Sequence, residues 1–373
     1  MKRNRRLFVL RASFAIVSFF LTLALSELWL RVFASPKAIL TDSDFWRIHW
    51  VGAHRSFSSG DPLQKNYLFD AYHPLLGWVP KPNYRSETVT INSKGLRGRK
   101  EYPTQKKRSE TRIIALGDSF TFGEGVGDEE TYPFFLEGLL KTCSVLNLGV
   151  HGYGTDQAYL YLKTEGFQYS PDLVILGIFV AESPWSSSVY RNVLSFRDYA
   201  KPRFVAVGDR LVLRNVPVPP PEVIARAPFP GPATSYLWNL FKRGVVSKTF
   251  FSAERQSRRI TTRILDQMLA ELTEHQAKFL IVTIPSGIGD PQGETELVLH
   301  HWAERRGVPI LHLREAFLEL EASQRKKVYA VHWTPFGNRA VAGILKRKLI
   351  EEGLAKEAQN GLSSVHTLSE KIF

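Results

Sequence analysis

Short apolar runs alternate with amphipathic segments over the second two thirds of the chain. Five apolar runs have the length of buried strands: Arg112–Gly117, Ser144–Val150, Pro171–Val180, Ala277–Pro285 and Val308–Leu313. The segments between them place apolar residues at helical spacing, most clearly in Glu129–Lys141, Thr155–Phe167 (with Thr155 as N-cap), Glu294–Gly307 and Thr334–Gly353. Apolar strands separated by helices are typical of a parallel sheet covered on both faces. The pattern therefore predicts a three-layer α/β/α fold with a central parallel sheet of about five strands.

The N-terminus carries a longer apolar run, Ala12–Leu30, which follows five basic residues. Nineteen residues of helix span roughly 28 Å, enough for the hydrocarbon core of a bilayer. A basic N-terminal flank favours a cytoplasmic N-terminus, so residues 1–34 are expected to anchor an extracytoplasmic protein. The alternative is a signal peptide cleaved after Val32–Ala34, but the apolar run is longer than a usual signal core.

Composition divides the remainder into segments. Residues 35–110 are rich in aromatic residues, Pro and Gly, and the α/β pattern then occupies residues 111–356. Residues 181–260 form an insertion between the third and fourth strands, with a hairpin expected at Gly208-Asp209. An insertion of this size is expected to build a lid or a wall of a substrate cleft. Residues 357–373 are expected to form a C-terminal tail.

The charge and the metal-binding residue types exclude several classes of function. The net charge is +13, but the five N-terminal cations account for part of it, and the other 44 basic and 36 acidic residues leave +8 without a basic helix. A nucleic-acid partner is therefore not predicted. The single Cys143 cannot form an intrachain disulfide. His300 and His301 are adjacent on a predicted helix and point in different directions, so we expect no metal site and no cofactor.

The candidate chemistry lies in "GDSFTFGEG", Gly117–Gly125, directly after the first strand. A phosphate-binding loop would need a Lys that is absent here, and the dinucleotide-binding glycine pattern is absent as well. The nucleophile elbow of α/β-hydrolases does not fit either, because Thr121 occupies its second glycine position. Two further blocks follow other elements, "NLGVHGYG" at Asn147–Gly154 and "VHWTPFGNR" at Val331–Arg339. In parallel sheets such strand ends gather at one edge, where ligands bind.

These three blocks, in this order, resemble those of the SGNH (GDSL-type) serine hydrolase family over roughly residues 112–353. The resemblance implies a flavodoxin-like fold with Ser119 as nucleophile and His332 as general base. It also implies that the backbone N–H groups of Ser119 and Gly152 form the oxyanion hole. A serine hydroxyl needs such a base, because it is a weak nucleophile until its proton is removed. His151 is an alternative base, but it adjoins the presumed oxyanion loop and is interpreted as lining the cleft. Ser286 also follows a strand, without a partner motif.

Two positions depart from the family pattern. Tyr329 stands where the family has the Asp that orients the histidine, and Ala181 stands where it has an Asn that donates to the oxyanion. Loss of a triad aspartate can lower turnover about 10⁴-fold, and loss of one oxyanion donor about 10²- to 10³-fold. Tyr329, a backbone carbonyl, Glu182 or Asn192 could orient His332 instead, and the sequence does not rank them.

The sequence thus predicts a serine-dependent ester hydrolase or acyltransferase, held in the cell membrane by its N-terminal helix. Its extracytoplasmic location and the family resemblance together favour O-acetyl groups of polysaccharides as substrate, with lipid esters second. The alternative is a catalytically inactive protein of the same fold that binds glycans or acts as a scaffold.

Overall fold

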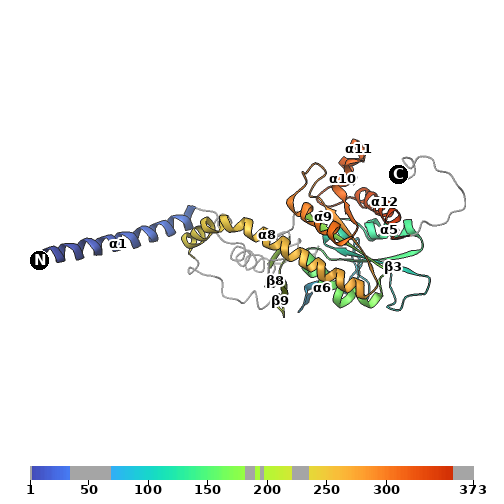
Figure 1. Cartoon of the computed structure of the whole chain (residues 1–373), viewed down its shortest axis with the longest axis horizontal. Coiled ribbons are helices and arrows are strands. Elements are labelled where there is room, and N and C mark those ends of the chain that lie inside the picture. Colours follow the sequence, from blue (N-terminus) through green and yellow to red (C-terminus); the bar gives the residue numbers. More distant parts are fainter. Residues whose placement is uncertain (1, 34–68, 181–189, 194–196, 221–234, 356–373) are drawn as a thin grey trace. The chain divides into compact units, whose positions relative to one another are not determined.

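The computed structural model describes residues 2–33, 69–180, 190–193, 197–220 and 235–355 (Figure 1). The chain divides into two compact units. The first comprises residues 1–62, 192–198 and 221–253, and the second comprises residues 63–191, 199–220 and 254–373. The domain boundaries expected from the sequence remain predictions, and much of the segment 35–110 and of the insertion 181–260 lies outside the described residues.

A five-stranded parallel sheet forms the centre of the second unit. Its strands are those the apolar runs predict: β3 (Thr111–Gly117), β4 (Cys143–Gly149), β5 (Leu173–Phe179), β10 (Lys278–Ile284) and β11 (Ile310–His312). The order is β11-β10-β5-β3-β4, and every pair is parallel. The chain therefore starts in the middle of the sheet and reverses direction between β3 and β5. In such sheets the reversal point opens a crevice at the carboxyl ends of the strands.

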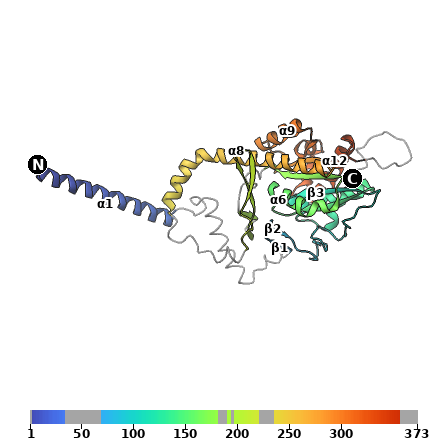
Figure 2. The same ribbon diagram turned by 60° about the horizontal axis from the view of Figure 1, so that its bottom comes forward.

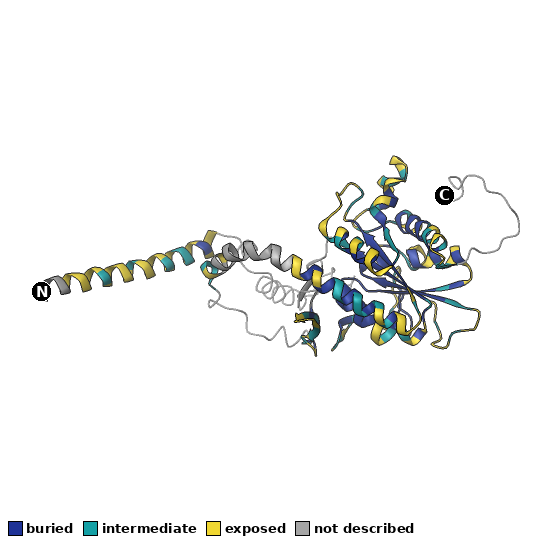
Figure 3. Ribbon diagram, in the orientation of Figure 1, coloured by how far each residue is buried: buried dark blue, intermediate teal, exposed yellow. Residues whose placement is uncertain are grey.

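Helices cover both faces of this sheet, so the predicted three-layer α/β/α fold is confirmed (Figures 1 and 2). A hydrophobic core lies on each face of the sheet. Successive strand residues point to opposite faces, so Ile114 lies in the first core and Ile113 in the second. The first core contains α6 (Thr155–Tyr161), α9 (Glu294–Arg306) and the C-terminal part of α8 (Tyr236–Glu274). The second contains α5 (Tyr132–Leu140), α10 (Leu313–Leu318), α11 (Ala322–Val328) and α12 (Pro335–Glu351). Figure 3 shows the buried strands between helices with exposed outer faces.

Two corrections concern helices. Thr155 is the first residue of α6 rather than its cap, because Gly154 has the extended backbone of the N-cap. The sequence pattern also does not predict α8, a helix of 39 residues whose first half falls in the region assigned to the insertion.

Short two-stranded sheets lie outside the central sheet. β1 (Asp70–His73) pairs with β2 (Gly77–Pro80), and the buried side chains of Leu76 and Trp78 enter the first core. The hairpin expected at Gly208-Asp209 is confirmed as β8 (Arg203–Val207) and β9 (Arg210–Arg214). β6 (Tyr190–Val193) and β7 (Arg197–Ala200) form another pair.

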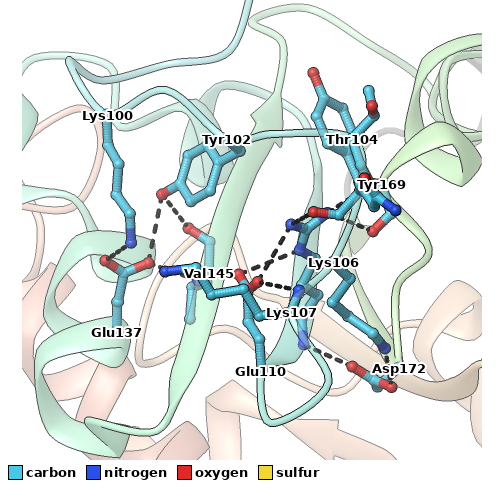
Figure 4. Close-up of polar contacts among 12 residues, drawn as sticks. Lys100, Tyr102, Thr104, Lys106, Lys107, Glu110, Glu137, Val145, Tyr169 and Asp172 are labelled. Carbon is cyan, nitrogen blue, oxygen red and sulfur yellow. Dashed lines mark hydrogen bonds and ion pairs between the residues drawn. The ribbon is translucent and has the colours of Figure 1, made fainter.

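A polar network fixes the edge of the sheet opposite the strand ends that carry the motifs (Figure 4). The fully buried guanidinium of Arg112, at the start of β3, donates to the carbonyl oxygens of Thr104 (3.0 Å) and Tyr169 (2.9 Å) and pairs with Glu110 (3.2 Å). The Arg112 backbone N–H donates to Asp172 at 2.7 Å. These contacts hold the polar segment before β3 against the amino-terminal ends of the strands. The motif blocks lie at the opposite, carboxyl-terminal ends.

One described helix is long and apolar enough to cross a membrane. It covers Arg6–Phe33 within α1 (Lys2–Phe33), and none of its most apolar stretch is buried against protein. Near its end, Glu27 pairs with Arg31 at 2.8 Å. The same carboxylate accepts hydrogen bonds from the backbone N–H groups of Tyr236 and Leu237, both at 2.8 Å, and so caps the start of α8 within the first unit.

Candidate active site

Ser119 is the first residue of a single helical turn, α4 (Ser119–Phe122), that follows β3 directly. The Asp118 carboxylate caps this turn by accepting a hydrogen bond from the backbone N–H of Phe120 at 2.9 Å. Gly123 ends the turn in the left-handed conformation, with φ 84°. Because the N–H groups of a first helical turn have no partner within the helix, the backbone at Ser119 is suited to hold a negative charge.

Three glycines make the space in which this turn sits. Gly117, Gly149 and Gly177 lie on the neighbouring strands β3, β4 and β5, respectively, and each approaches Thr121 or its backbone. A Cβ at Gly149 would lie 2.2 Å from the Phe122 backbone nitrogen, and a Cβ at Gly177 would lie 2.9 Å from Thr121 Oγ1. The fully buried Thr121 thus fills a depression over Gly117, Gly149 and Gly177, here called the glycine saddle, which exists only because these residues have no side chains. Ser119 is fixed over the strand ends as a result.

The structure brings Ser119 and His332 together. His332 Nε2 lies 2.9 Å from Ser119 Oγ, although 213 residues separate them in the chain. The histidine precedes α12, which begins after the cap Thr334 and is tied to α5 by a 2.9 Å bond from the Tyr132 N–H to Asn338 Oδ1. The Phe120 ring packs against the imidazole with centroids 4.9 Å apart. The catalytic pair that the sequence suggested therefore has the distance of a hydrogen bond.

Tyr329 does not orient His332 through its hydroxyl. The phenol donates instead to the Pro285 carbonyl oxygen at 3.0 Å, so the hypothesis that this hydroxyl replaces the missing acid is wrong. Among the described residues, no carboxylate forms a hydrogen bond or ion pair with His332. Burial lowers the pKa of His332, and the charge of Glu124 opposes this only in part. The neutral form of His332 is therefore favoured at pH 7.

The predicted oxyanion residue Gly152 lies at a turn beside β3. The Val150 N–H donates to the Gly117 carbonyl at 3.0 Å, which attaches the start of the turn two residues before Ser119. Gly152 has φ +81°, a conformation that favours glycine. Within the described part of the chain, no acceptor takes the Gly152 N–H. The turn, attached to the end of β3 just before Ser119, thus offers a backbone N–H donor without an acceptor among the described residues.

His151 and the remaining candidates have other partners or lie elsewhere. His151 is buried, and its Nε2 lies 2.7 Å from Asp70 of β1, so it does not line an open cleft as the sequence analysis supposed. His300 Nδ1 contacts His312 Nε2 at 3.0 Å, and no three potential metal ligands cluster among the described residues. Asn192 lies in β6, whereas Ala181 and Glu182 are outside the described residues.

A cavity of about 30 Å³ lies at the reversal point of the sheet. The ends of β3 and β5 form part of its wall, at Gly117-Asp118 and Gly177–Phe179, and α8 and α9 contribute Arg258, Thr261 and Thr295. Arg258 also pairs with Glu294 at 2.6 Å. Since a cavity needs about 10–15 Å³ of this measure to hold one water, the space suits a group of two or three heavy atoms.

Comparison with known proteins was made by sequence and by structure. No family model matches the chain, and no curated protein matches it. Solved structures with a similar fold include a lipase/acylhydrolase from Enterococcus faecalis (15% identity, TM-score 0.40, covering 67% of this chain and 100% of that one). Others are an acetylxylan esterase from Geobacillus stearothermophilus (13%, 0.38, 66% and 96%) and a GDSL-like lipase from Bacteroides thetaiotaomicron (11%, 0.37, 66% and 92%).

These similarities are distant and assign no activity to this chain. The five-stranded parallel sheet between helices has the three-layer α/β/α architecture that the sequence resemblance implies. The chemistry must be argued from the site itself.

Proposed function

We propose that this protein is an SGNH-type serine hydrolase that cleaves or transfers acyl esters through an acyl-Ser119 intermediate. The observation that carries the proposal is the 2.9 Å contact between Ser119 Oγ and His332 Nε2 at the reversal point of the sheet. A serine on a capped turn, a neutral histidine in contact with it and a backbone N–H nearby are the parts that acyl transfer requires.

The reaction follows from the roles of these groups. His332 Nε2 takes the proton of Ser119 as its oxygen attacks the ester carbonyl carbon. The resulting oxyanion is held by the backbone N–H groups of Ser119 and Gly152. When the tetrahedral intermediate collapses, the protonated His332 gives its proton to the leaving alkoxide. Water, or an acceptor hydroxyl, then attacks the acyl-enzyme with His332 again as base.

The acyl group is acetyl in this proposal, and the substrate is an O-acetylated polysaccharide outside the cytoplasm. The cavity beside Asp118, which directly precedes Ser119, has room for two or three heavy atoms and supports a short acyl group. The apolar helix Arg6–Phe33, preceded by basic residues, would anchor the protein in the cell membrane with residues 34–373 outside. A protein in this location would meet glycans whose hydroxyl groups carry acetyl esters.

Labelling of the purified full-length protein in detergent by a serine-directed phosphonate tests the proposal. We expect wild type to be labelled at Ser119 and to release acetate from aryl acetates. Ser119→Ala and His332→Ala should abolish both signals, because neither group functions without the other. Tyr329→Phe is the matched control: its hydroxyl bonds Pro285, so turnover should stay within about twofold.

A folded wild type that neither accepts the phosphonate nor releases acetate would contradict the proposal. The same result would favour a glycan-binding protein that has lost its chemistry, for which the lack of a carboxylate on His332 among the described residues is the supporting observation.

A further inference from the structure

The peptide between His151 and Gly152 has a fixed orientation. Residues Val150–Tyr153 form a turn closed by a 3.1 Å hydrogen bond from the Tyr153 N–H to the Val150 carbonyl oxygen. Gly152 is the third residue of this turn and has φ +81°, which defines the turn as type II. The related type I turn differs mainly by rotation of this central peptide through about 180°. The direction of the Gly152 N–H therefore depends on which of the two forms the turn adopts.

Trp78 holds the carbonyl side of this same peptide. Its indole Nε1–H donates to the His151 carbonyl oxygen at 3.0 Å, and the Trp78 side chain is fully buried in β2. In a planar trans peptide the C=O and the following N–H point in opposite directions. The bond to His151 O therefore also determines where the Gly152 N–H points, and rotation of the peptide would leave a buried indole without its acceptor.

Further contacts hold the turn against the β1–β2 hairpin. The Tyr153 hydroxyl donates to the Trp78 carbonyl oxygen at 2.5 Å, and the two rings pack edge to face. The His151 ring contacts Asp70 at 2.7 Å, and the Gln157 side chain donates to the Leu76 carbonyl at 2.7 Å. The segment His151–Gln157 is thus attached at three positions to the β1–β2 hairpin, more than seventy residues earlier in the chain.

We propose that Trp78 is a positioning residue for the oxyanion hole: its indole N–H holds the His151–Gly152 peptide so that the Gly152 N–H faces the substrate oxyanion. The inference rests on the proposed hydrolase function. A rigid Gly152 donor would also help the proposed site to work with Ala181 in place of the usual Asn. Preorganised donors stabilise a transition state without a reorganisation cost.

The test compares Trp78→Phe with Trp302→Phe in the full-length protein. Trp302 is an equally buried tryptophan whose indole donates at 3.0 Å, but to Asp266, in the contact between α8 and α9. Both variants lose one indole hydrogen bond. We expect kcat for an aryl acetate to fall at least tenfold in Trp78→Phe with KM within about twofold, since an oxyanion donor acts in the transition state. Trp302→Phe should keep the wild-type kcat.

Equal kcat values in the two variants would overturn the inference while leaving the hydrolase function standing. A crystal structure of Trp78→Phe supplies a second measurement that needs no activity. We expect Gly152 to leave the φ of +81° found in the wild type as the central peptide rotates. An unrotated peptide would refute the role of Trp78 even if the protein proved to have no hydrolase activity.

Discussion

At the scale of single residues, the candidate site contains a histidine, His332, that contacts Ser119 and is bonded to no carboxylate among the described residues. In a full triad a carboxylate would favour the imidazolium and raise the histidine's pKa. Here burial acts in the opposite direction and lowers the pKa of His332 below its usual value of about 6.5. The neutral form, which accepts the serine proton, is therefore the favoured form around pH 7.

This arrangement predicts the pH dependence of turnover. As pH falls through the pKa of His332, the ring becomes protonated and can no longer accept the Ser119 proton. We expect kcat/KM for an aryl acetate to decrease on the acid side with a midpoint below about 6.5. A pH–rate profile of the purified protein measures this midpoint. A midpoint clearly above 6.5 would instead indicate an acid near His332 that the described residues do not include.

At the scale of elements, the turn carrying Ser119 depends on the glycine saddle beneath it. Gly149→Ala would place a Cβ 2.2 Å from the Phe122 backbone nitrogen, which cannot move without shifting the turn. We expect it to lower the free energy of unfolding by about 3 kcal/mol and to abolish phosphonate labelling. Denaturant unfolding and labelling measure the two effects.

The control for this experiment is Gly138→Ala in α5. A Cβ at Gly138 meets nothing within 4 Å, so alanine should stabilise the helix by about 0.5–1 kcal/mol and leave labelling unchanged. If the two variants had the same free energy of unfolding and the same phosphonate labelling, the glycine saddle would not be what holds Ser119 in place.

The sequence predicted the elements of the sheet better than the contacts around the site. Five apolar runs were sufficient to place the strands. A strand that is buried on both faces of the sheet is a continuous run of apolar residues, which can be recognised from the local sequence alone. The Ser119–His332 pair came from motif resemblance. The bond from Trp78 to His151 joins residues 73 positions apart, and no local pattern reports such a contact. α8 was not predicted, because most of its residues fall in the segment 181–260 that was assigned to an insertion between strands.

At the scale of the whole molecule, the basic flank and the apolar helix predict which side of the membrane the site occupies. A C-terminal fusion to alkaline phosphatase, which is active only outside the cytoplasm, should be active in intact cells. A C-terminal reporter that folds only in the cytoplasm should be silent. The opposite pattern would contradict both the location and the polysaccharide substrate. Neutral residues in place of the five N-terminal cations should weaken the orientation, which provides the control.

Under the proposed function, the 213 residues between Ser119 and His332 also determine when the chain becomes active during biosynthesis. Synthesis proceeds from the N-terminus, so Ser119 leaves the ribosome long before His332 does. The proposed general base reaches Ser119 only after the segment that carries it has been made and α12 has docked on α5 through Asn338. We therefore expect a nascent or truncated chain that ends before residue 332 to be inactive. Completion of the polypeptide would itself activate the serine.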